Sequence, residues 1–320
     1  MKNFWNNLPK PLFVLAPMAD VTDAAFRRVI AKYGKPDVTW TEFVSADGLV
    51  LAPEEGKKKL LKDLEYSESE RPIVAQLFSS KPDNMEKAAA LCRELGFDGV
   101  DINMGCPDKG IERQGCGAAM IKDPENAKAV ILAAMKGAQD IPVSVKTRLG
   151  YNKDELETWL PAILSTNPAA VTIHARTRKE MSKVPARWER VKRAVEIRNE
   201  LKSLALILGN GDALDISDAK LKAEETGCDG VMLGRAIFGN PFLFAKGKGE
   251  ISLHEKLEVM LEHTKLFEEL LGTTKNFSVM KKHYKAYVHG FDHAQELRVK
   301  LMATENAGEV EKLVREFLGK

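Results

Sequence analysis

The sequence predicts a (β/α)8 TIM barrel followed by a C-terminal all-helical domain. Short apolar runs recur roughly every 30 residues with helical stretches between them, which is typical of repeated βαβ units. A polar residue stands at or just past the end of each apolar run. After a short linker at residues 246–249, apolar residues recur only at helical spacing. We therefore expect a barrel domain over residues 1–245 and a helical domain over residues 250–320.

The apolar runs predict eight strands, over residues 12–16, 38–41, 73–77, 99–102, 143–146, 170–173, 205–208 and 230–233. Helices are predicted over residues 24–33, 82–95, 126–138, 156–164, 188–199 and 216–225. Gly96, Gly137 and Gly227 stand where three of these helices should end. The polar segment 53–71 has no clear periodicity, and no element is predicted there. An open doubly wound sheet is the alternative, but no Gly-x-Gly-x-x-Gly pattern follows the first strand.

Composition restricts the class of protein. An apolar fraction of 44% is ordinary for a soluble chain, and no apolar run approaches the ~18 residues that a membrane span needs. The N-terminus has no secretory h-region, so a cytoplasmic location is expected. Four cysteines, Cys92, Cys106, Cys116 and Cys228, show neither a disulfide framework nor metal-ligand spacing, so no metal is predicted. The net charge of +2 does not indicate whether the chain binds nucleic acid. Evidence for such binding must come from local clusters of charged residues.

The polar residues at the strand ends form the first candidate site. They are Met18, Glu42, Gln76, Asn103, Lys146, His174, the triplet Asn210, Gly211 and Asp212, and the pair Gly234 and Arg235. The carboxyl ends of parallel barrel strands meet at one face, where active sites are built. A single such residue is usually a solvated loop residue. Because amides, a lysine, a histidine and the Cys106 thiol that follows Asn103 occur together, we expect an active site at this face.

Cys106 is the most informative single residue. It lies between Gly105 and Pro107, shortly after the predicted strand 99–102, and therefore on a tight turn. A thiol on such a turn can reach a bound substrate. The alternative is a small buried loop residue, because free cysteine packs as an apolar group.

The predicted helical domain carries a basic segment. Lys281, Lys282, Lys285 and Arg298 are interleaved with His283, Tyr284, Tyr287, His289 and His293. Lysine and arginine near aromatic side chains suit phosphate contact and base stacking. The alternative is a solvated helix face.

Taken in order, these residues resemble the flavin-dependent tRNA-dihydrouridine synthases over nearly the whole chain. The matching motifs are residues 16–23, 41–45, 75–77, 101–107, 115–118, 145–148, 173–177, 210–212, 234–235 and, in the tail, 280–283 and 296–298. Asp20 departs from this pattern, because many members have Gly there. Residues 182–188 also depart, since they replace a Gly-rich turn. The second departure leaves open which subfamily the chain resembles and which position in the RNA it targets. It does not affect the expected chemistry.

The resemblance implies FMN at the barrel mouth, reduced by NADPH, with hydride transfer to C6 of a tRNA uracil and proton delivery to C5 by Cys106. A thiol of ordinary pKa, ~8.5, is protonated at pH 7 and able to donate. The implied FMN-binding residues are Pro17, Met18, Ala19, Gln76, Lys146, His174, Asn210, Gly211, Asp212, Gly234 and Arg235. Lys146 would stabilise the negative charge of the reduced ring.

The resemblance also assigns substrate contacts. Asn103 and Arg176 are candidates for the uracil, and Lys281, Lys282, Lys285 and Arg298 for tRNA phosphates. The target base must leave the RNA stack, which costs a few kcal/mol that phosphate contacts must offset. No protein partner is inferred.

Two other functions stay open. One is another FMN barrel acting on a free pyrimidine, such as a dihydroorotate dehydrogenase, although that family's loop after strand four typically reads Asn-x-Ser-x-Pro-Asn. The other is an RNA-binding barrel without catalysis, against which the presence of Cys106, Lys146 and His174 argues.

Overall fold

The computed structural model describes residues 3–319 of the chain. Its parallel strands follow one another around a nearly closed barrel in the order β1-β9-β8-β7-β6-β5-β4-β2, and the short strand β3 pairs with β4. The seam lies between β1 and β2, which are in contact. The strands are β1 (Leu12–Leu15), β2 (Thr39–Trp40), β3 (Val44–Ser45), β4 (Ile73–Phe78), β5 (Gly99–Met104), β6 (Val143–Arg148), β7 (Ala170–His174), β8 (Leu206–Asn210) and β9 (Gly230–Leu233).

All eight predicted strands are present, and several run further than predicted. Asn103, His174 and Asn210 were expected just past their strands, yet each belongs to the last two residues of a strand. Their backbones continue the ladder while their side chains supply polar groups at the carboxyl ends of the strands.

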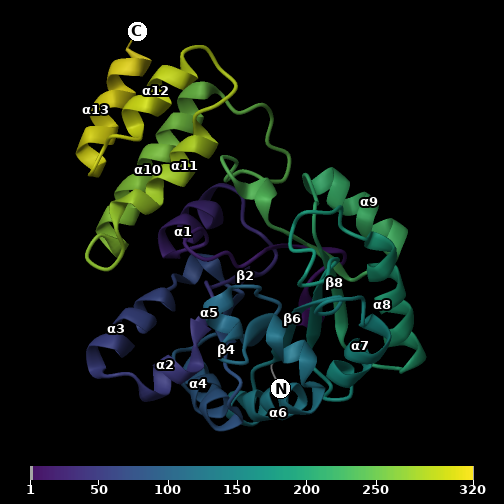
Figure 1. Cartoon of the computed structure of the whole chain (residues 1–320). Helices are drawn as coiled ribbons and strands as arrows, with labels where there is room; N and C mark the ends of the chain where they lie inside the picture. Colours follow the sequence, from purple (N-terminus) through teal and green to yellow (C-terminus); the bar gives the residue numbers. More distant parts are fainter. Residues whose placement is uncertain (1–2, 320) are drawn as a thin grey trace.

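Helices surround the barrel, as Figure 1 shows. The six predicted helices are α1 (Ala24–Tyr33), α4 (Pro82–Glu94), α6 (Pro124–Ala138), α7 (Leu156–Leu164), α8 (Trp188–Glu200) and α9 (Ile216–Thr226). Additional short helices are α2 (Ala46–Leu51), α3 (Glu54–Asp63) and α5 (Lys109–Glu112), with 3-10 turns η1 (Phe4–Asn7), η2 (Glu68–Glu70), η3 (Gly117–Lys122), η4 (Arg235–Ile237) and η5 (Phe277–Val279). Helix α3 occupies the segment for which no element was predicted. It buries no residue, so its sequence carries no apolar stripe.

The glycine predictions were correct at two positions and misplaced at one. Gly96 and Gly227 follow α4 and α9 with φ of +81° and +69°, the left-handed conformation that ends helices. Gly137 instead lies inside α6. A Cβ there would stand 1.9 Å from the carbonyl oxygen of Glu86 in α4. Gly137 therefore allows two neighbouring helices to approach closely.

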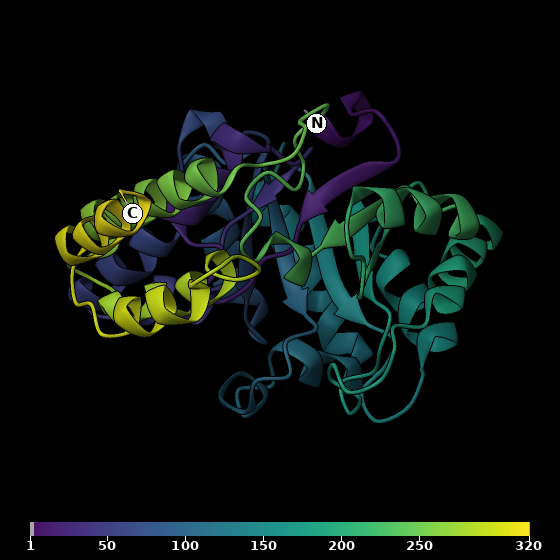
Figure 2. The same ribbon diagram turned by 90° about the horizontal axis from the view of Figure 1, so that it is seen from above.

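The C-terminal residues form four helices, α10 (Leu253–Leu271), α11 (Met280–Tyr287), α12 (Ala294–Leu301) and α13 (Ala307–Leu318). They lie together on the α1 side of the barrel in both views (Figures 1 and 2). Their apolar core includes Ala25 and Val29 of α1, so the helical domain and the barrel share buried surface. None of the helices within residues 3–319 is both long and apolar enough to cross a membrane.

Candidate active site

A cavity of about 700 Å³ opens at the carboxyl ends of β1, β6, β7, β8 and β9, within the size range of small-molecule sites. Most of the predicted cofactor residues line it, together with Arg176. These lining residues are Pro17, Met18, Lys146, His174, Arg176, Asn210, Gly211, Asp212, Gly234 and Arg235. The structure thus brings predicted residues from five separate strand ends together in one cavity.

Several predicted residues lie outside this lining, and Cys106 is one of them. Ala19 is exposed on the loop after β1. Gln76 and Asn103 are buried in the barrel and hydrogen-bond to each other. Glu42, two residues past β2, accepts hydrogen bonds from Lys275 Nζ of the tail at 2.7 Å and from the Asp20 amide at 2.5 Å. Glu42 therefore joins the helical domain to the loop after β1.

The turn that carries Cys106 is held from three sides. Asn103 Oδ1 accepts hydrogen bonds from the backbone amides of Gly105 and Cys106, at 3.1 and 2.9 Å. Arg148 Nε donates to the Gly105 carbonyl at 2.7 Å. The Ala118 amide donates to the Cys106 carbonyl at 2.9 Å. Gly117 makes this approach possible: its φ is +61°, and a Cβ would stand 2.6 Å from the Cys106 oxygen.

The Cys106 thiol is half-buried, and burial raises its pKa. The charges of Arg148 and Lys146 act in the opposite direction, so both cations are close enough to favour a thiolate once one forms. The group is protonated at neutral pH and suited to give up a proton. Cys116 is buried at 1% exposure with its Sγ 3.5 Å from the Gln114 carbonyl.

Lys146 brings positive charge into the cavity. Its Nζ donates to Asn210 Oδ1 at 3.2 Å, and Asn210 Nδ2 donates to the Met232 carbonyl at 2.8 Å, which fixes that orientation of the amide. Burial, and next the charge of Arg148, lowers the pKa of Lys146 to about 8. The ammonium is still the main form at pH 7, and its hydrogen-bond acceptor is a neutral amide. An anionic ligand group would complement it.

His174 lies beside Arg176, whose Nη1 is 3.1 Å from His174 Nε2. Guanidinium only donates, so this imidazole nitrogen accepts and the ring is neutral. Burial, together with the charges of Arg148 and Lys146, holds the pKa of His174 well below its usual value. The ring can therefore offer its other nitrogen as a hydrogen-bond donor without adding charge.

Asp212 organises the opposite wall of the cavity. It accepts hydrogen bonds from Arg176, from Arg235 Nη2 at 2.5 Å and from the Ala186 amide at 2.8 Å. Gly211 precedes it with φ of +127°, and a Cβ there would lie 2.8 Å from that of Ala186. Arg235 itself is 69% exposed. An exposed guanidinium and a glycine backbone after β8 and β9 are features that suit a phosphate.

The segment after β7 is fastened beside this site. Arg148 Nη1 donates to the carbonyls of Thr177 and Met181, at 3.2 and 3.1 Å. Arg178 forms a two-pronged ion pair with Glu112 of α5, close in sequence to the Cys106 turn. One arginine, Arg148, thus holds both the Cys106 turn and the segment after β7.

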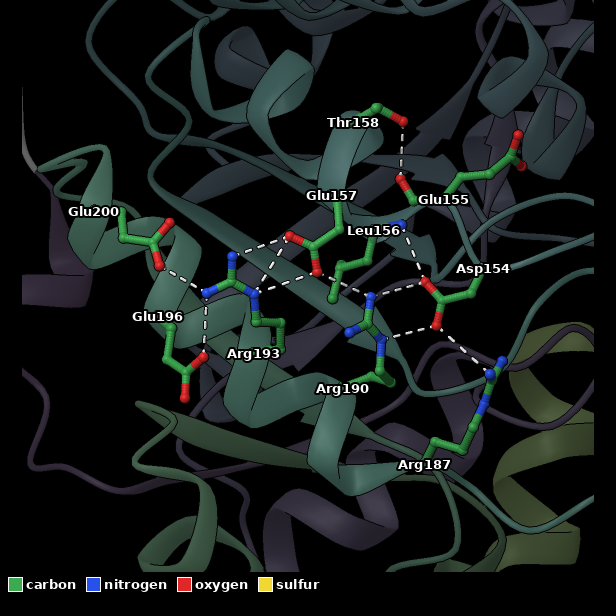
Figure 3. Close-up of polar contacts among 10 residues, drawn as sticks. All are labelled: Asp154, Glu155, Leu156, Glu157, Thr158, Arg187, Arg190, Arg193, Glu196 and Glu200. Atoms are coloured by element: carbon green, nitrogen blue, oxygen red, sulfur yellow. Dashed lines mark hydrogen bonds and ion pairs between the residues drawn. The ribbon is translucent and has the colours of Figure 1, made fainter.

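An ion-pair network on the outer wall anchors the far end of this segment (Figure 3). Arg187, at the end of the departing loop, and Arg190 both pair with Asp154. Arg193 continues the network to Glu157, Glu196 and Glu200. Sequence reasoning missed these residues, although Arg193 and Glu196 stand at the i,i+3 spacing that favours such pairs.

The basic tail is arranged differently from the prediction. Lys285 is exposed and Lys281, Lys282 and Arg298 are half-buried, but none of these four lines the cavity. His283, Tyr284 and Tyr287 are each 0% exposed. Base stacking on these three rings was a wrong expectation, because they form part of the helical core. His283 packs edge-on against Phe26 of α1, with ring centroids 4.9 Å apart.

Comparison with known proteins gives a consistent result. A family model described as Dihydrouridine synthase (Dus) matches residues 14–319. The chain is 42% identical to "Probable tRNA-dihydrouridine synthase 2" of Bacillus subtilis (strain 168) over 318 residues, covering 99% of this chain and 97% of that protein. It is 40% identical to "Probable tRNA-dihydrouridine synthase" of Staphylococcus aureus (strain MRSA252), covering 99% of this chain and 96% of that one.

Solved structures with the same barrel fold are distant in sequence. Morphinone reductase in complex with tetrahydroNAD superposes with a TM-score of 0.51 at 13% identity, covering 75% of this chain and 87% of that one. Histamine dehydrogenase from Rhizobium sp. 4-9 gives a TM-score of 0.54 at 13% identity, covering 79% of this chain and 48% of that one. At this identity the similarity concerns the fold alone.

Proposed function

This chain belongs to the dihydrouridine synthase family, and from that premise we propose that it reduces the C5–C6 bond of specific tRNA uridines, using FMN as cofactor and NADPH as electron donor. The observation that carries the proposal is the half-buried Cys106 thiol on a turn clamped by Asn103 and Arg148. The names of the relatives support tRNA as the substrate.

The cavity residues fit FMN in the chemistry of their donor groups. Lys146 and the neutral His174 offer hydrogen-bond donors where a flavin ring accumulates negative charge. Gly211 and Arg235 suit its phosphate. No Gly-x-Gly-x-x-Gly pattern favours a dinucleotide. Gln76 stays a predicted contact of the ring, although its amide is engaged by Asp101 and Asn103.

Bound FMN would supply the hydride that adds to C6 of the uracil ring. The chain's own task is to deliver the proton that C5 must gain at the same time. Cys106 Sγ gives up this proton and is left as a thiolate, which the nearby charges of Arg148 and Lys146 stabilise. A proton from solvent then restores the thiol. The overall change is addition of one hydride and one proton across the double bond.

The uracil contacts assigned to Asn103 and Arg176 stay predictions. Both side chains have protein partners: Asn103 binds the Cys106 turn, while Arg176 Nε donates to the Val184 carbonyl at 2.6 Å. Each could still touch a ring through remaining hydrogen-bonding positions.

Cofactor extraction and steady-state turnover test the proposal together. The purified protein should release FMN rather than FAD, and unmodified tRNA should stimulate its NADPH oxidation while forming dihydrouridine. The same tRNA already carrying dihydrouridine serves as the matched control and should not stimulate. Stimulation by orotate or dihydroorotate instead of tRNA would favour the free-pyrimidine alternative. A colourless protein that binds tRNA would favour the non-catalytic one.

A further inference from the structure

A chain of buried polar side chains crosses three adjacent strands and ends at the Cys106 turn. Gln76 of β4 stands opposite Asp101 of β5, and Asp101 stands opposite Ser144 of β6. Asn103 follows two residues after Asp101, so its side chain leaves the same face of β5. These four residues are at most 7% exposed.

The hydrogen bonds along this chain are continuous. Ser144 Oγ donates to Asp101 Oδ1, and Gln76 Nε2 donates to Asp101 Oδ2, both at 2.6 Å. Asn103 Nδ2 donates to Gln76 Oε1 at 3.0 Å. Asn103 Oδ1 then accepts the backbone amides of the Cys106 turn. Every link is a direct contact, and the last one touches the residue that carries the thiol.

The carboxylate gives the chain one consistent direction. An ionised carboxylate only accepts, so Gln76 must turn its NH2 group toward Asp101 and its carbonyl toward Asn103. Asn103 must then turn its NH2 group toward Gln76, which leaves its carbonyl for the two backbone amides. Burial raises the pKa of Asp101 to about 6, so the group is mainly ionised at neutral pH. Reversing either amide would place two donors against each other.

We propose that Asp101 is a positioning residue that, through Gln76 and Asn103, holds the Cys106 turn in the conformation from which the thiol donates its proton. Asp101 does not line the cavity, and these hydrogen bonds are its direct connection to the Cys106 turn. The kinetic part of the proposal rests on the proposed function. The geometric part, that Asp101 restrains the turn, does not.

Alkylation of Cys106 measures the restraint without any turnover. Cys106 is half-buried, whereas Cys92, Cys116 and Cys228 are 0%, 1% and 6% exposed. A limiting amount of iodoacetamide on the holoenzyme should therefore label Cys106 first, and the Cys106→Ala variant gives the background. A turn without its restraint exposes the thiol more often and is labelled faster.

Two substitutions at Asp101 separate hydrogen bonding from simple packing. Asp101→Ala removes the acceptor of Gln76, whereas Asp101→Asn retains one carbonyl acceptor of the same shape. We expect Cys106 to be labelled at least ~3-fold faster in the alanine variant. Hydride transfer from the reduced enzyme to unmodified tRNA should be at least ~10-fold slower, since small misplacements of reacting groups slow a reaction strongly. The asparagine variant should stay within ~3-fold of wild type in both measurements. tRNA affinity should not change in either variant. Hydride transfer is compared after the flavin has been fully reduced, so a change in the rate of reduction by NADPH does not enter the comparison.

Thr39→Val is the matched control, because Thr39 is a buried polar residue of β2 that takes no part in the hydrogen bonds from Ser144 to the Cys106 turn. It should behave as wild type. If Asp101→Ala does not fold, Gln76→Met breaks the chain at the next link with little change in volume, and labelling of Cys106 should again be faster.

Wild-type labelling in a folded Asp101→Ala or Gln76→Met variant would overturn the proposal, as would an asparagine variant as impaired as the alanine one. If the wild type transfers nothing to tRNA, the proposed function fails, while the labelling comparison still decides whether Asp101 restrains the turn.

Discussion

The barrel mouth and the helical tail carry the same kinds of side chain, histidine, lysine and arginine, and use them in opposite ways. At the mouth, Lys146 and His174 face a cavity and keep hydrogen-bonding capacity for a ligand. In the tail, His283 is completely buried against Phe26 of α1, where the C-terminal helices meet the barrel. Residue type alone therefore does not reveal a site. Position relative to the fold decides which role a polar side chain takes.

The first prediction sharpens this comparison within the mouth and carries the largest effect. Cys106→Ala should retain its flavin and be reduced by NADPH at the wild-type rate, because only the proton donor is removed. Hydride transfer from the reduced variant to tRNA should slow by ~10²–10⁴-fold, the range for general acid catalysis. Rapid-mixing measurement of flavin absorbance resolves the two half-reactions.

Cys116→Ala is the internal control for that prediction. Cys116 is buried on the loop that packs against the Cys106 turn, and this variant should retain activity. An inactive Cys116→Ala variant beside an active Cys106→Ala variant would reverse the assignment.

The second prediction concerns the core role of the tail. Tyr287→Ala removes a fully buried ring from the helical domain and should lower the free energy of unfolding by ~3–5 kcal/mol. Lys285→Ala, two residues earlier on the exposed face, should change it by less than ~0.5 kcal/mol. Chemical denaturation of both variants measures the difference. Equal effects would mean that the ring is not part of the core.

The third prediction is a pH dependence with a defined sign. Burial lowers the pKa of His283 to about 3, below the ordinary value of 6.5. Between these values the unfolded chain binds a proton that the folded chain does not, so stability is full above pH 6.5 and declines as the pH falls toward 3. His283→Phe should weaken this acid sensitivity, measured as the change in melting temperature between pH 7 and pH 5. An unchanged difference would show that other groups determine it.

The fourth prediction has the smallest expected effect and tests the outer face of the tail. Lys281, Lys282, Lys285 and Arg298 are proposed to contact tRNA phosphates. Changing all four to alanine should weaken tRNA binding. The slope of log affinity against log salt concentration should become shallower by ~0.7–0.9 for each phosphate that is no longer neutralised. Flavin content and NADPH-dependent reduction should be unaffected. Titration at two salt concentrations measures affinity and slope, and the alternative of a solvated helix face requires both to equal those of wild type.

The barrel mouth was predictable because chain topology determines it. Once the eight strands are assigned, parallel pairing brings Lys146, His174 and Asn210 to one face whatever the loops do. The tail aromatics were misassigned although the signal was present. Met280, His283, Tyr284 and Tyr287 follow the i, i+3, i+4, i+7 spacing of a buried helix face.

Other features could not be predicted because they depend on geometry across strands or on surface packing. The contact of Gln76 with Asp101 requires the register of β4 and β5, which no local pattern specifies. The outer network of Arg190 with Asp154 joins two segments whose relative position only the folded barrel defines. Helix α3 buries no residue completely, and of its residues only Leu60 is an apolar side chain packed against the core, so it leaves no clear periodic signal.

The most direct test of the central claim is a gain of function. The chain should be expressed in a bacterial strain whose tRNA contains no dihydrouridine, and the tRNA mapped nucleotide by nucleotide. Dihydrouridine should appear at one or a few specific positions with the wild-type chain and be absent or strongly reduced with Cys106→Ala at equal protein level. tRNA that stays free of dihydrouridine in the presence of folded, flavin-loaded wild-type protein would contradict the proposed function.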